Sequence, residues 1–207
     1  NSINLPPVNE MDGLIVAFIT RRHTVVPLAV KLTPEQAAAV FMLGESIETS
    51  AGDPKRAGES IREVGTNPFI IGDKSYEGNW FYDFVKRHEG KVRCYQLNTG
   101  GLGEIIEKQP NGARVFKRKV QRVEIPEMSS IIRGITRGTN KWSKDKYWNV
   151  EVPTSVQGMD ISKYNVEKFY DVDDTIKQVS DLRLERAEYM EKFNTLDKAI
   201  INAAKTM

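Results

Sequence analysis

The chain has 207 residues and a mass of 23.5 kDa, with 40% hydrophobic and 28% charged residues. This length and composition indicate one globular domain, or one domain with an appendage, and argue against a collagen-like, low-complexity or mainly disordered chain. Thirty Lys and Arg against 28 Asp and Glu leave a net charge of +2, so charge gives no indication of nucleic acid or a membrane as a partner. The single Cys excludes an internal disulfide and a Cys-rich zinc site, and it fits a reducing, cytoplasmic compartment.

No segment is typical of a membrane span or a signal peptide. The longest apolar run, residues 14–19, is far shorter than the roughly 20 residues that span a bilayer. Residues 1–12 are polar, contain Pro6-Pro7, and are interpreted as a lead-in without a folded element. Because the first residue is Asn1 and not Met, we expect a processed chain or a fragment of a longer protein.

The first predicted element is a strand over residues 13–20. Its continuous apolar and β-branched residues predict a strand buried on both faces of a sheet under helices. The polar residues Arg21, Arg22, His23 and Thr24 follow it and form a loop at its carboxyl end. In open α/β sheets, ligands bind in loops at that end of the strands.

A helix is predicted next. Thr33 is a suitable cap, Pro34 fits the first helical position and Gln36 completes a capping box, so the helix begins here and runs to Leu43. Beyond it, the segment 50–66 is rich in Gly, Ser, Pro and charge, which indicates a long surface loop.

The remaining chain alternates strands and helices, which predicts an α/β protein with a mixed sheet flanked by helices. The order of the predicted elements is a short strand at 68–71, a helix around 80–88, a strand at 92–97, a hairpin from 105 to 116 turning at 110–112, a helix at 126–137 closed by Gly138, a strand at 147–152 ended by Pro153, and an amphipathic helix at 173–193.

The glycine-rich corner, residues 97–103, is the first candidate site. A strand that ends in glycines exposes backbone N–H groups that can approach a phosphate, so Asn98 and Gly100 are candidate contacts. No Gly-Lys-Ser/Thr follows, so this is not a Walker-type loop. On pattern alone, a plain turn at a strand end is about twice as favoured.

Basic residues form two further candidates. Arg21 and Arg22 could clamp a carboxylate or phosphate, and His23 beside them could titrate near neutral pH. The stretch 114–122 could bind an anion through one of its arginines, although its alternation also fits the solvated face of a hairpin.

Other chemistry-bearing residues are interpreted as structural. His88 lies late in a helix, where a cation meets the negative end of the helix dipole. Cys94 lies inside a strand and is interpreted as a core residue, while Asp173 and Asp174 indicate a helix start. No metal-ligating motif and no catalytic triad order is visible, so no metal or catalytic residue is assigned.

An ordered set of short motifs resembles the C-terminal half of the ATP-dependent phosphoenolpyruvate carboxykinase family. The likeness runs from about Leu14 to Phe193 and is moderately specific as a set. The motifs, in chain order, are Phe18-Ile19-Thr20, Val26-Pro27, Lys31-Leu32-Thr33-Pro34-Glu35-Gln36-Ala37, Leu97-Asn98-Thr99-Gly100, Arg122-Val123-Glu124-Ile125, Ile131-Ile132, Val152-Pro153-Thr154 and Gly158-Met159-Asp160.

The resemblance implies a nucleotide-binding α/β segment at 13–165, followed by a helical extension at 166–207 that packs on it. The family decarboxylates oxaloacetate and phosphorylates the enolate from ATP with Mg²⁺ or Mn²⁺. Its P-loop and metal ligands lie upstream of the matched region, so the full-length protein would supply them. The resemblance places Arg122 at the phosphates, and Val123 and Met128 beside the nucleotide. It further implies that the isolated chain binds no cofactor and is inactive.

Several residues depart from the family pattern. Met128 stands where the family has a Thr hydroxyl, residues 21–25 replace Ala-Asp-Ala-Phe-Gly with one residue fewer, and Gly101 replaces a Trp. These departures suggest a divergent branch of the family, which we expect to be bacterial. The expected partners are nucleotide, a small oxoacid and the upstream half of the same protein, with no nucleic acid and no membrane. A nucleotide- or anion-binding module without catalysis, and a purely structural domain, remain as alternatives.

Overall fold

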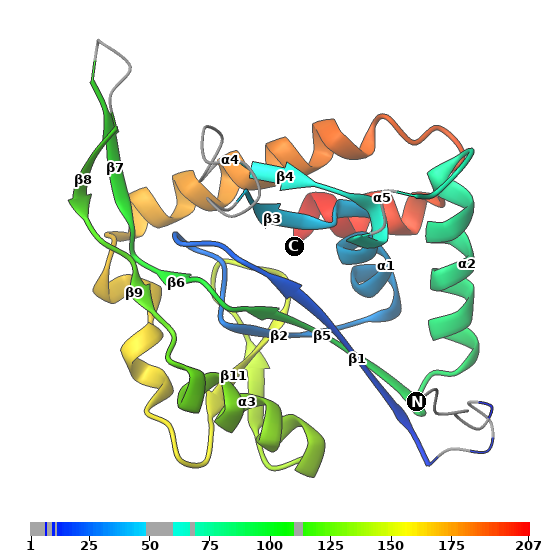
Figure 1. The fold of residues 1–207 in the computed structure, drawn as a ribbon, viewed down its shortest axis with the longest axis horizontal. Coiled ribbons are helices and arrows are strands. Elements are labelled where there is room, and N and C mark those ends of the chain that lie inside the picture. Colours follow the sequence, from blue (N-terminus) through cyan, green and yellow to red (C-terminus); the bar gives the residue numbers. More distant parts are fainter. Residues whose placement is uncertain (1–6, 8–9, 11, 49–59, 67–68, 110–113) are drawn as a thin grey trace.

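A five-stranded mixed sheet organises the molecule (Figure 1). The computed structural model describes residues 7, 10, 12–48, 60–66, 69–109 and 114–207. β1 and β5 are parallel, and every other neighbouring pair in this sheet is antiparallel. The predicted α/β class with a mixed sheet is therefore confirmed. The strand order is β1 (Leu14–Thr20), β5 (Val92–Asn98), β2 (Ala29–Leu32), β11 (Glu151–Ser155) and β10 (Lys141–Lys144).

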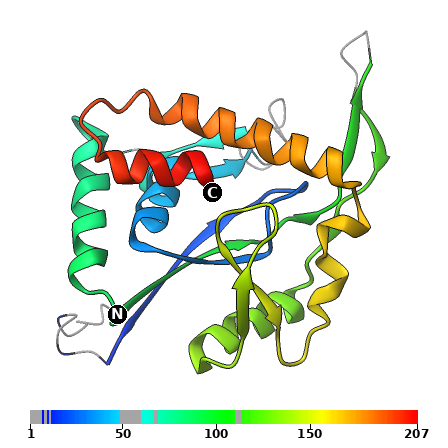
Figure 2. The ribbon, with the colours of Figure 1, turned by 180° about the vertical axis from the view of Figure 1, so that it is seen from behind.

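Helices cover both faces of the sheet. One face carries α1 (Pro34–Leu43), α2 (Lys74–Arg87), α4 (Val172–Met190) and α5 (Lys198–Thr206). The other face carries α3 (Ile125–Arg137). Seen from behind, α4 runs across the molecule above α5 (Figure 2). Within the described residues, no helix is long and apolar enough to cross a membrane.

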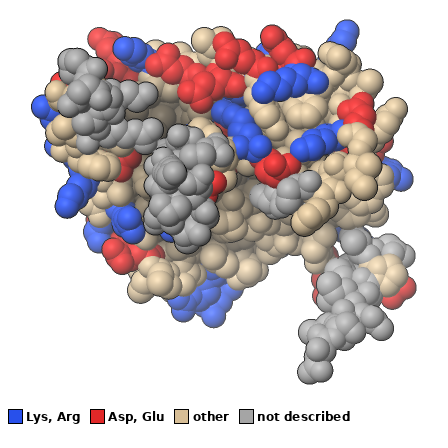
Figure 3. Space-filling view, turned by 45° about the horizontal axis from the view of Figure 1, so that its top comes forward, with Lys and Arg blue, Asp and Glu red and all other residues tan. Residues whose placement is uncertain are grey.

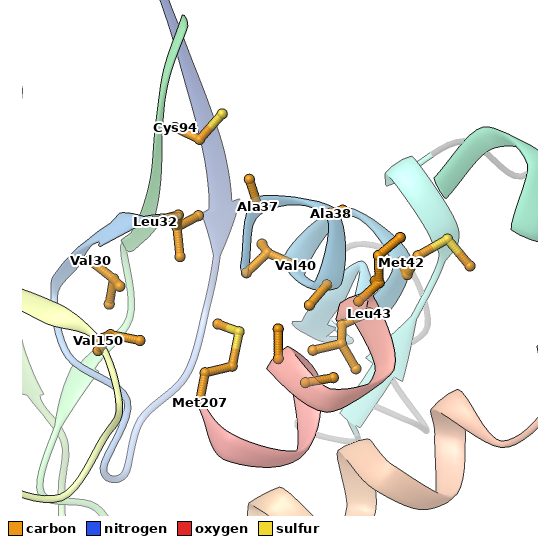
Figure 4. Packing of buried hydrophobic residues seen from close by; sticks show 14 of the residues in the cluster. Val30, Leu32, Ala37, Ala38, Val40, Met42, Leu43, Cys94, Val150 and Met207 are labelled. Atoms are coloured by element: carbon orange, nitrogen blue, oxygen red, sulfur yellow. The ribbon is translucent and has the colours of Figure 1, made fainter. Parts of the chain in front are cut away.

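The larger core lies under the four-helix face (Figure 4). Because side chains alternate along a strand, Val30, Leu32 and Cys94 point into this core while their neighbours point away. α4 and α5 bury residues in the same cluster as α1, so the C-terminal helices and the sheet share one core. The helical contributors include Ala38, Val40, Met42, Leu43, Val179, Met190, Ile200 and Ala204.

The smaller core lies between the sheet and α3. Ala29, Tyr95 and Leu97 supply its sheet side, and Met128, Ile131 and Ile135 supply its helix side. Ile131 is fully buried. The spacing of these α3 residues is the apolar stripe that lets one helix cover a sheet face.

Three two-stranded ribbons surround the main sheet. They are β3 (Glu45–Ile47) with β4 (Ser60–Arg62), β6 (Gly101–Leu102) with β9 (Gln121–Arg122), and β7 (Ile105–Lys108) with β8 (Arg114–Arg118). The last pair confirms the predicted hairpin strands, whereas its turn at 110–112 lies outside the described residues. Short 3-10 turns occur at η2 (Val64–Thr66), η3 (Ile161–Tyr164) and η4 (Val166–Lys168).

Local capping sets the predicted helix ends. Thr33 Oγ1 accepts from the Gln36 backbone N–H at 3.3 Å, and Gln36 Oε1 accepts from the Thr33 N–H at 3.0 Å. This reciprocal capping box confirms the predicted start of α1. Gly138 ends α3 in the left-handed conformation, with φ of 68°, as predicted.

Two strand predictions are wrong in detail. β1 is an edge strand and not a doubly buried one, since β5 is its only partner among the described strands, and Ile19 is 56% exposed. The strand expected at 147–152 is instead β11, which begins at Glu151 and contains Pro153. Asp145 Oδ1 accepts from the backbone N–H groups of Tyr147 and Trp148, both at 2.8 Å, and this side-chain turn replaces the strand.

Two loop-region predictions also need correction. Residues 69–71 form no strand, and Phe69 and Ile71 are 84% and 98% exposed. The long loop expected at 50–66 ends in β4 and η2, while residues 50–59 lie outside the described part. α5 lies within the helical extension expected at 166–207, but no motif predicts where it begins; Ile200 and Met207 of this region are buried in the larger core.

Candidate functional site

The two parallel strands of the sheet end side by side. In their register Thr20 pairs with Asn98, so the loop after β1 and the glycine-rich corner after β5 begin at one edge of the sheet. The Thr99 N–H donates to the Thr20 carbonyl oxygen at 2.9 Å, which ties the two turns together. The two candidate regions predicted from the sequence are thus neighbours at the carboxyl ends of parallel strands.

Asn98 fixes this junction from the inside. Its side chain is fully buried, and Oδ1 accepts from the backbone N–H groups of Arg22 at 2.8 Å and Gly100 at 3.0 Å. Its Nδ2 donates to the carbonyl oxygens of Val26 at 2.9 Å and Gly101 at 3.3 Å. All four bonding positions of the amide are therefore used within the chain, so Asn98 positions the loops around the site.

The glycines allow three backbone segments to meet. A Cβ on Gly100 would lie 2.2 Å from the Arg22 carbonyl oxygen. Gly101 has φ of 134°, and a Cβ there would lie 2.1 Å from the Gln121 carbonyl oxygen. Close packing explains both glycines, in agreement with the plain-turn alternative.

Pairing of β6 with β9 brings Arg122 to this corner. Gly101 and Arg122 are register partners although they lie 21 positions apart (101 and 122) in the sequence. Arg122 is exposed, so its guanidinium is accessible to a ligand. The structure therefore places Arg122 beside Gly100 at the same edge of the sheet.

His23, in the loop after β1, contacts Glu104, which follows the glycine-rich corner. Its Nδ1 lies 3.4 Å from Glu104 Oε1, and its carbonyl oxygen accepts from the Glu104 N–H at 2.9 Å. Burial lowers the pKa of His23, Glu104 opposes that change, and the positive charges of Arg122 and Arg21 add to it. Arg21, His23 and Arg122 thus lie along one rim of the corner, in which the carboxylate of Glu104 opposes the charges of the two arginines.

The remaining basic residues of the predicted stretch are mostly structural. Arg118 Nε donates to the Gly103 carbonyl oxygen at 2.6 Å, Nη2 donates to that of Phe169, and the guanidinium lies 5.0 Å from the Tyr170 ring centroid. Lys117 pairs with Glu107 at 2.8 Å. Arg22, predicted to contact an anion beside Arg21, turns away from the corner and pairs with Glu45 at 2.9 Å.

The start of α3 lies next to Arg122. Met128 is buried in the smaller core and Val123 packs at its border. The Tyr164 hydroxyl donates to the Glu127 carboxylate and lies 3.0 Å from the Arg122 carbonyl oxygen. Burial and the Glu127 carboxylate raise the pKa of Tyr164. Tyr164 thereby fixes β9 against α3, a role that sequence reasoning missed because its partners lie about 40 residues away.

Residues interpreted as structural behave as predicted. Cys94 is buried, and burial raises the pKa of its thiol to about 11. His88 caps the end of α2 and its ring packs 4.9 Å from that of Phe84. Asp173 and Asp174 lie in the first turn of α4.

Two large hollows are found in the described part of the chain, and the first of them reaches the corner at Leu102. One, of about 450 Å³, is lined by Tyr147, Trp148, Tyr164 and their neighbours, and the other, of about 670 Å³, lies between α1, α2 and β5. Neither is lined by Arg122, Asn98 or Gly100. Within the described residues, no group of three or more His, Cys, Asp or Glu is placed to hold a metal ion.

Comparison with known proteins gives two results. The family model described as phosphoenolpyruvate carboxykinase matches residues 5–162. Phosphoenolpyruvate carboxykinase (ATP) of Aeropyrum pernix is 30% identical over 184 residues, which cover 88% of this chain and 33% of that protein. The chain therefore spans about one third of the length of the curated relative that it matches.

Proposed function

The chain belongs to the phosphoenolpyruvate carboxykinase family, and we propose that it is the C-terminal part of an ATP-dependent carboxykinase. In this proposal it supplies one wall of the nucleotide pocket for decarboxylation of oxaloacetate and phosphoryl transfer to give phosphoenolpyruvate. The rest of the protein supplies the triphosphate cradle. Catalysis then rests on positioning and on neutralising phosphate charge.

The observation that carries this proposal is the position of Arg122. Its exposed side chain stands at the carboxyl ends of β1 and β5, with Arg21 and His23 in the same rim. A guanidinium donates in a planar fork and stays charged, which suits the oxygens of a phosphate. The role of Met128 and Val123 is to build the floor behind that rim, where they are packed in the smaller core.

Metal chemistry is assigned to the rest of the protein. The Mg²⁺ or Mn²⁺ that accompanies ATP in this family neutralises phosphate charge when bound. The described residues of this chain offer no cluster of ligands for such an ion. We expect the chain alone to be inactive and to bind no cofactor of its own.

We assign the edge of β1 as the surface that contacts the upstream part of the protein. Among the described strands only β5 pairs with β1, and Ile19 on this edge is 56% exposed. An unpaired strand edge with apolar side chains is suited to pair with a further strand. In this proposal the occupant is the upstream part of the protein, since the chain matches only 33% of its carboxykinase relative.

Arg122→Ala in the full-length protein tests the proposal. We expect ATP binding, measured by calorimetry, to weaken by about 1.5–3 kcal/mol, the scale of a hydrogen bond to a charged group. Arg137→Ala is the matched control, because Arg137 is an exposed arginine at the far end of α3. Unchanged affinity in Arg122→Ala, or an equal loss in the control, would remove Arg122 from the nucleotide pocket.

A binding module without catalysis is the second candidate. The loop after β1 is held by the ion pair of Arg22 with Glu45 and by the contact of His23 Nδ1 with Glu104 Oε1, so these two side chains serve the fold. The same full-length protein separates the two functions. ATP binding without phosphoryl transfer to oxaloacetate would favour the module, whereas formation of phosphoenolpyruvate would favour the enzyme.

A further inference from the structure

The strand that carries Arg122 is very short. β9 consists of Gln121 and Arg122, and it pairs with the two residues of β6, Gly101 and Leu102. A pair of two-residue strands has little stability of its own, because most strands have about five or six residues. Both residues of β9 are also exposed, so neither anchors the strand in a core. The position of the Arg122 main chain therefore depends on contacts from other elements.

Tyr164 makes such a contact from η3, 42 positions beyond Arg122. Its hydroxyl lies 3.0 Å from the Arg122 carbonyl oxygen and donates to the Glu127 carboxylate. Tyr164 is 8% exposed, and it belongs to the smaller core together with Met128 and Ile131. Because the ring is packed, the place of its hydroxyl is fixed. Tyr164 therefore holds the Arg122 carbonyl group at a set position relative to α3.

Glu127 extends this contact to the start of α3. Its Oε2 accepts from the Glu124 N–H at 3.0 Å, and its Oε1 lies 3.5 Å from Lys163 Nζ. Burial acts to raise the pKa of Glu127, but hydrogen bonds from Tyr164 and the Glu124 N–H and the charge of Lys163 lower it overall. Glu127 is thus a carboxylate at neutral pH and a strong acceptor for the Tyr164 hydroxyl.

We propose that Tyr164 is a positioning residue for Arg122, and that its contact with the Arg122 carbonyl oxygen raises the affinity for ATP. This inference rests on the proposed function, in which the Arg122 guanidinium meets the phosphates. Tyr164 itself touches no phosphate and acts through the main chain of β9. A group held in place before its ligand arrives loses less conformational freedom on binding, so binding is tighter.

Tyr164→Phe in the full-length protein removes the hydroxyl and keeps the buried ring. We expect the dissociation constant for ATP, measured by calorimetry, to rise about threefold to tenfold, the effect of one lost hydrogen bond. Urea unfolding checks that the variant is folded. Tyr82→Phe is the matched control, because Tyr82 is 6% exposed and its hydroxyl donates to Glu35 at 2.9 Å, in the larger core. It should bind ATP as the unaltered protein does.

A double-mutant cycle separates positioning from general support of the fold. In an Arg122→Ala background, Tyr164→Phe should have no further effect on ATP affinity, because the group that it positions is gone. Equal losses in the two backgrounds, or unchanged affinity in Tyr164→Phe alone, would overturn this inference and leave the proposed function standing. Unchanged affinity in Arg122→Ala would instead overturn the proposed function, and this inference with it.

Discussion

His23 is a single residue whose environment makes stability depend on pH. Burial, Arg122 and Arg21 lower its pKa from the ordinary value of 6.5 in the folded chain. Below about pH 6.5 the unfolded chain therefore takes up the proton first. We expect the free energy of unfolding to fall as pH decreases from about 6.5 through the lowered pKa, and to be insensitive to His23 above that range.

His23→Gln checks this expectation, because glutamine is polar but does not titrate. Urea unfolding at a series of pH values between about 8 and 5 should show a flatter pH profile in the variant than in the unaltered chain. His88→Gln is the control, since His88 lies at the end of α2, away from the rim. Identical profiles for His23→Gln and the unaltered chain would show that His23 does not titrate differently on folding.

For single residues, the sequence indicates which side chains lie at the candidate site, but it does not indicate their hydrogen-bond and ion-pair partners. Arg122 is predicted from the family resemblance, and it is exposed at the glycine corner. Asn98 is also predicted, yet its amide serves Arg22 and Val26, which lie 76 and 72 residues away. The buried ion pair of Glu45 with Arg186 could not be predicted, because nothing local in the sequence relates these two residues across 141 positions.

Among whole elements, those set by local chemistry are predictable. The start of α1 follows from Thr33, Pro34 and Gln36 within one turn. The position of β11 does not follow from its local sequence. The backbone N–H groups of Tyr147 and Trp148 donate to Asp145 and form a turn where the apolar pattern predicts a strand. The edge location of β1 depends on which strands lie beside it, and an apolar pattern in one strand carries no such information.

The glycine corner offers a test of how elements pack. In Gly100→Ala the new methyl group would meet the backbone of Arg22, which cannot move without breaking the Asn98 hydrogen bonds. We expect a loss of about 2–4 kcal/mol in the free energy of unfolding, measured with urea. Gly90→Ala is the control, because open space surrounds that position and only its φ of 88° opposes a side chain. Its loss should be smaller, about 1–2 kcal/mol, and equal losses would contradict the packing argument.

At the scale of the whole molecule, two cores hold the sheet between α3 and the other helices. The charged side chains on the α4 face are of both signs (Figure 3), so this face gives no sign of a strongly charged partner. The β1 edge is different, because it combines a strand edge that has no partner among the described strands with the exposed Ile19. In the absence of the upstream part of the protein, this edge is expected to pair with a second copy of the chain.

Sedimentation velocity over a range of protein concentrations measures that association. We expect the chain to self-associate, and Ile19→Lys to weaken association by at least about tenfold, since a charged side chain on a strand edge opposes pairing. Ile71→Lys is the matched control, because Ile71 is 98% exposed but belongs to no strand, and it should associate as the unaltered chain does. Restoring the upstream part of the protein should abolish association through the same edge. A chain that stays monomeric at every concentration, or equal weakening by both variants, would contradict the assignment of β1 as the surface for the upstream part.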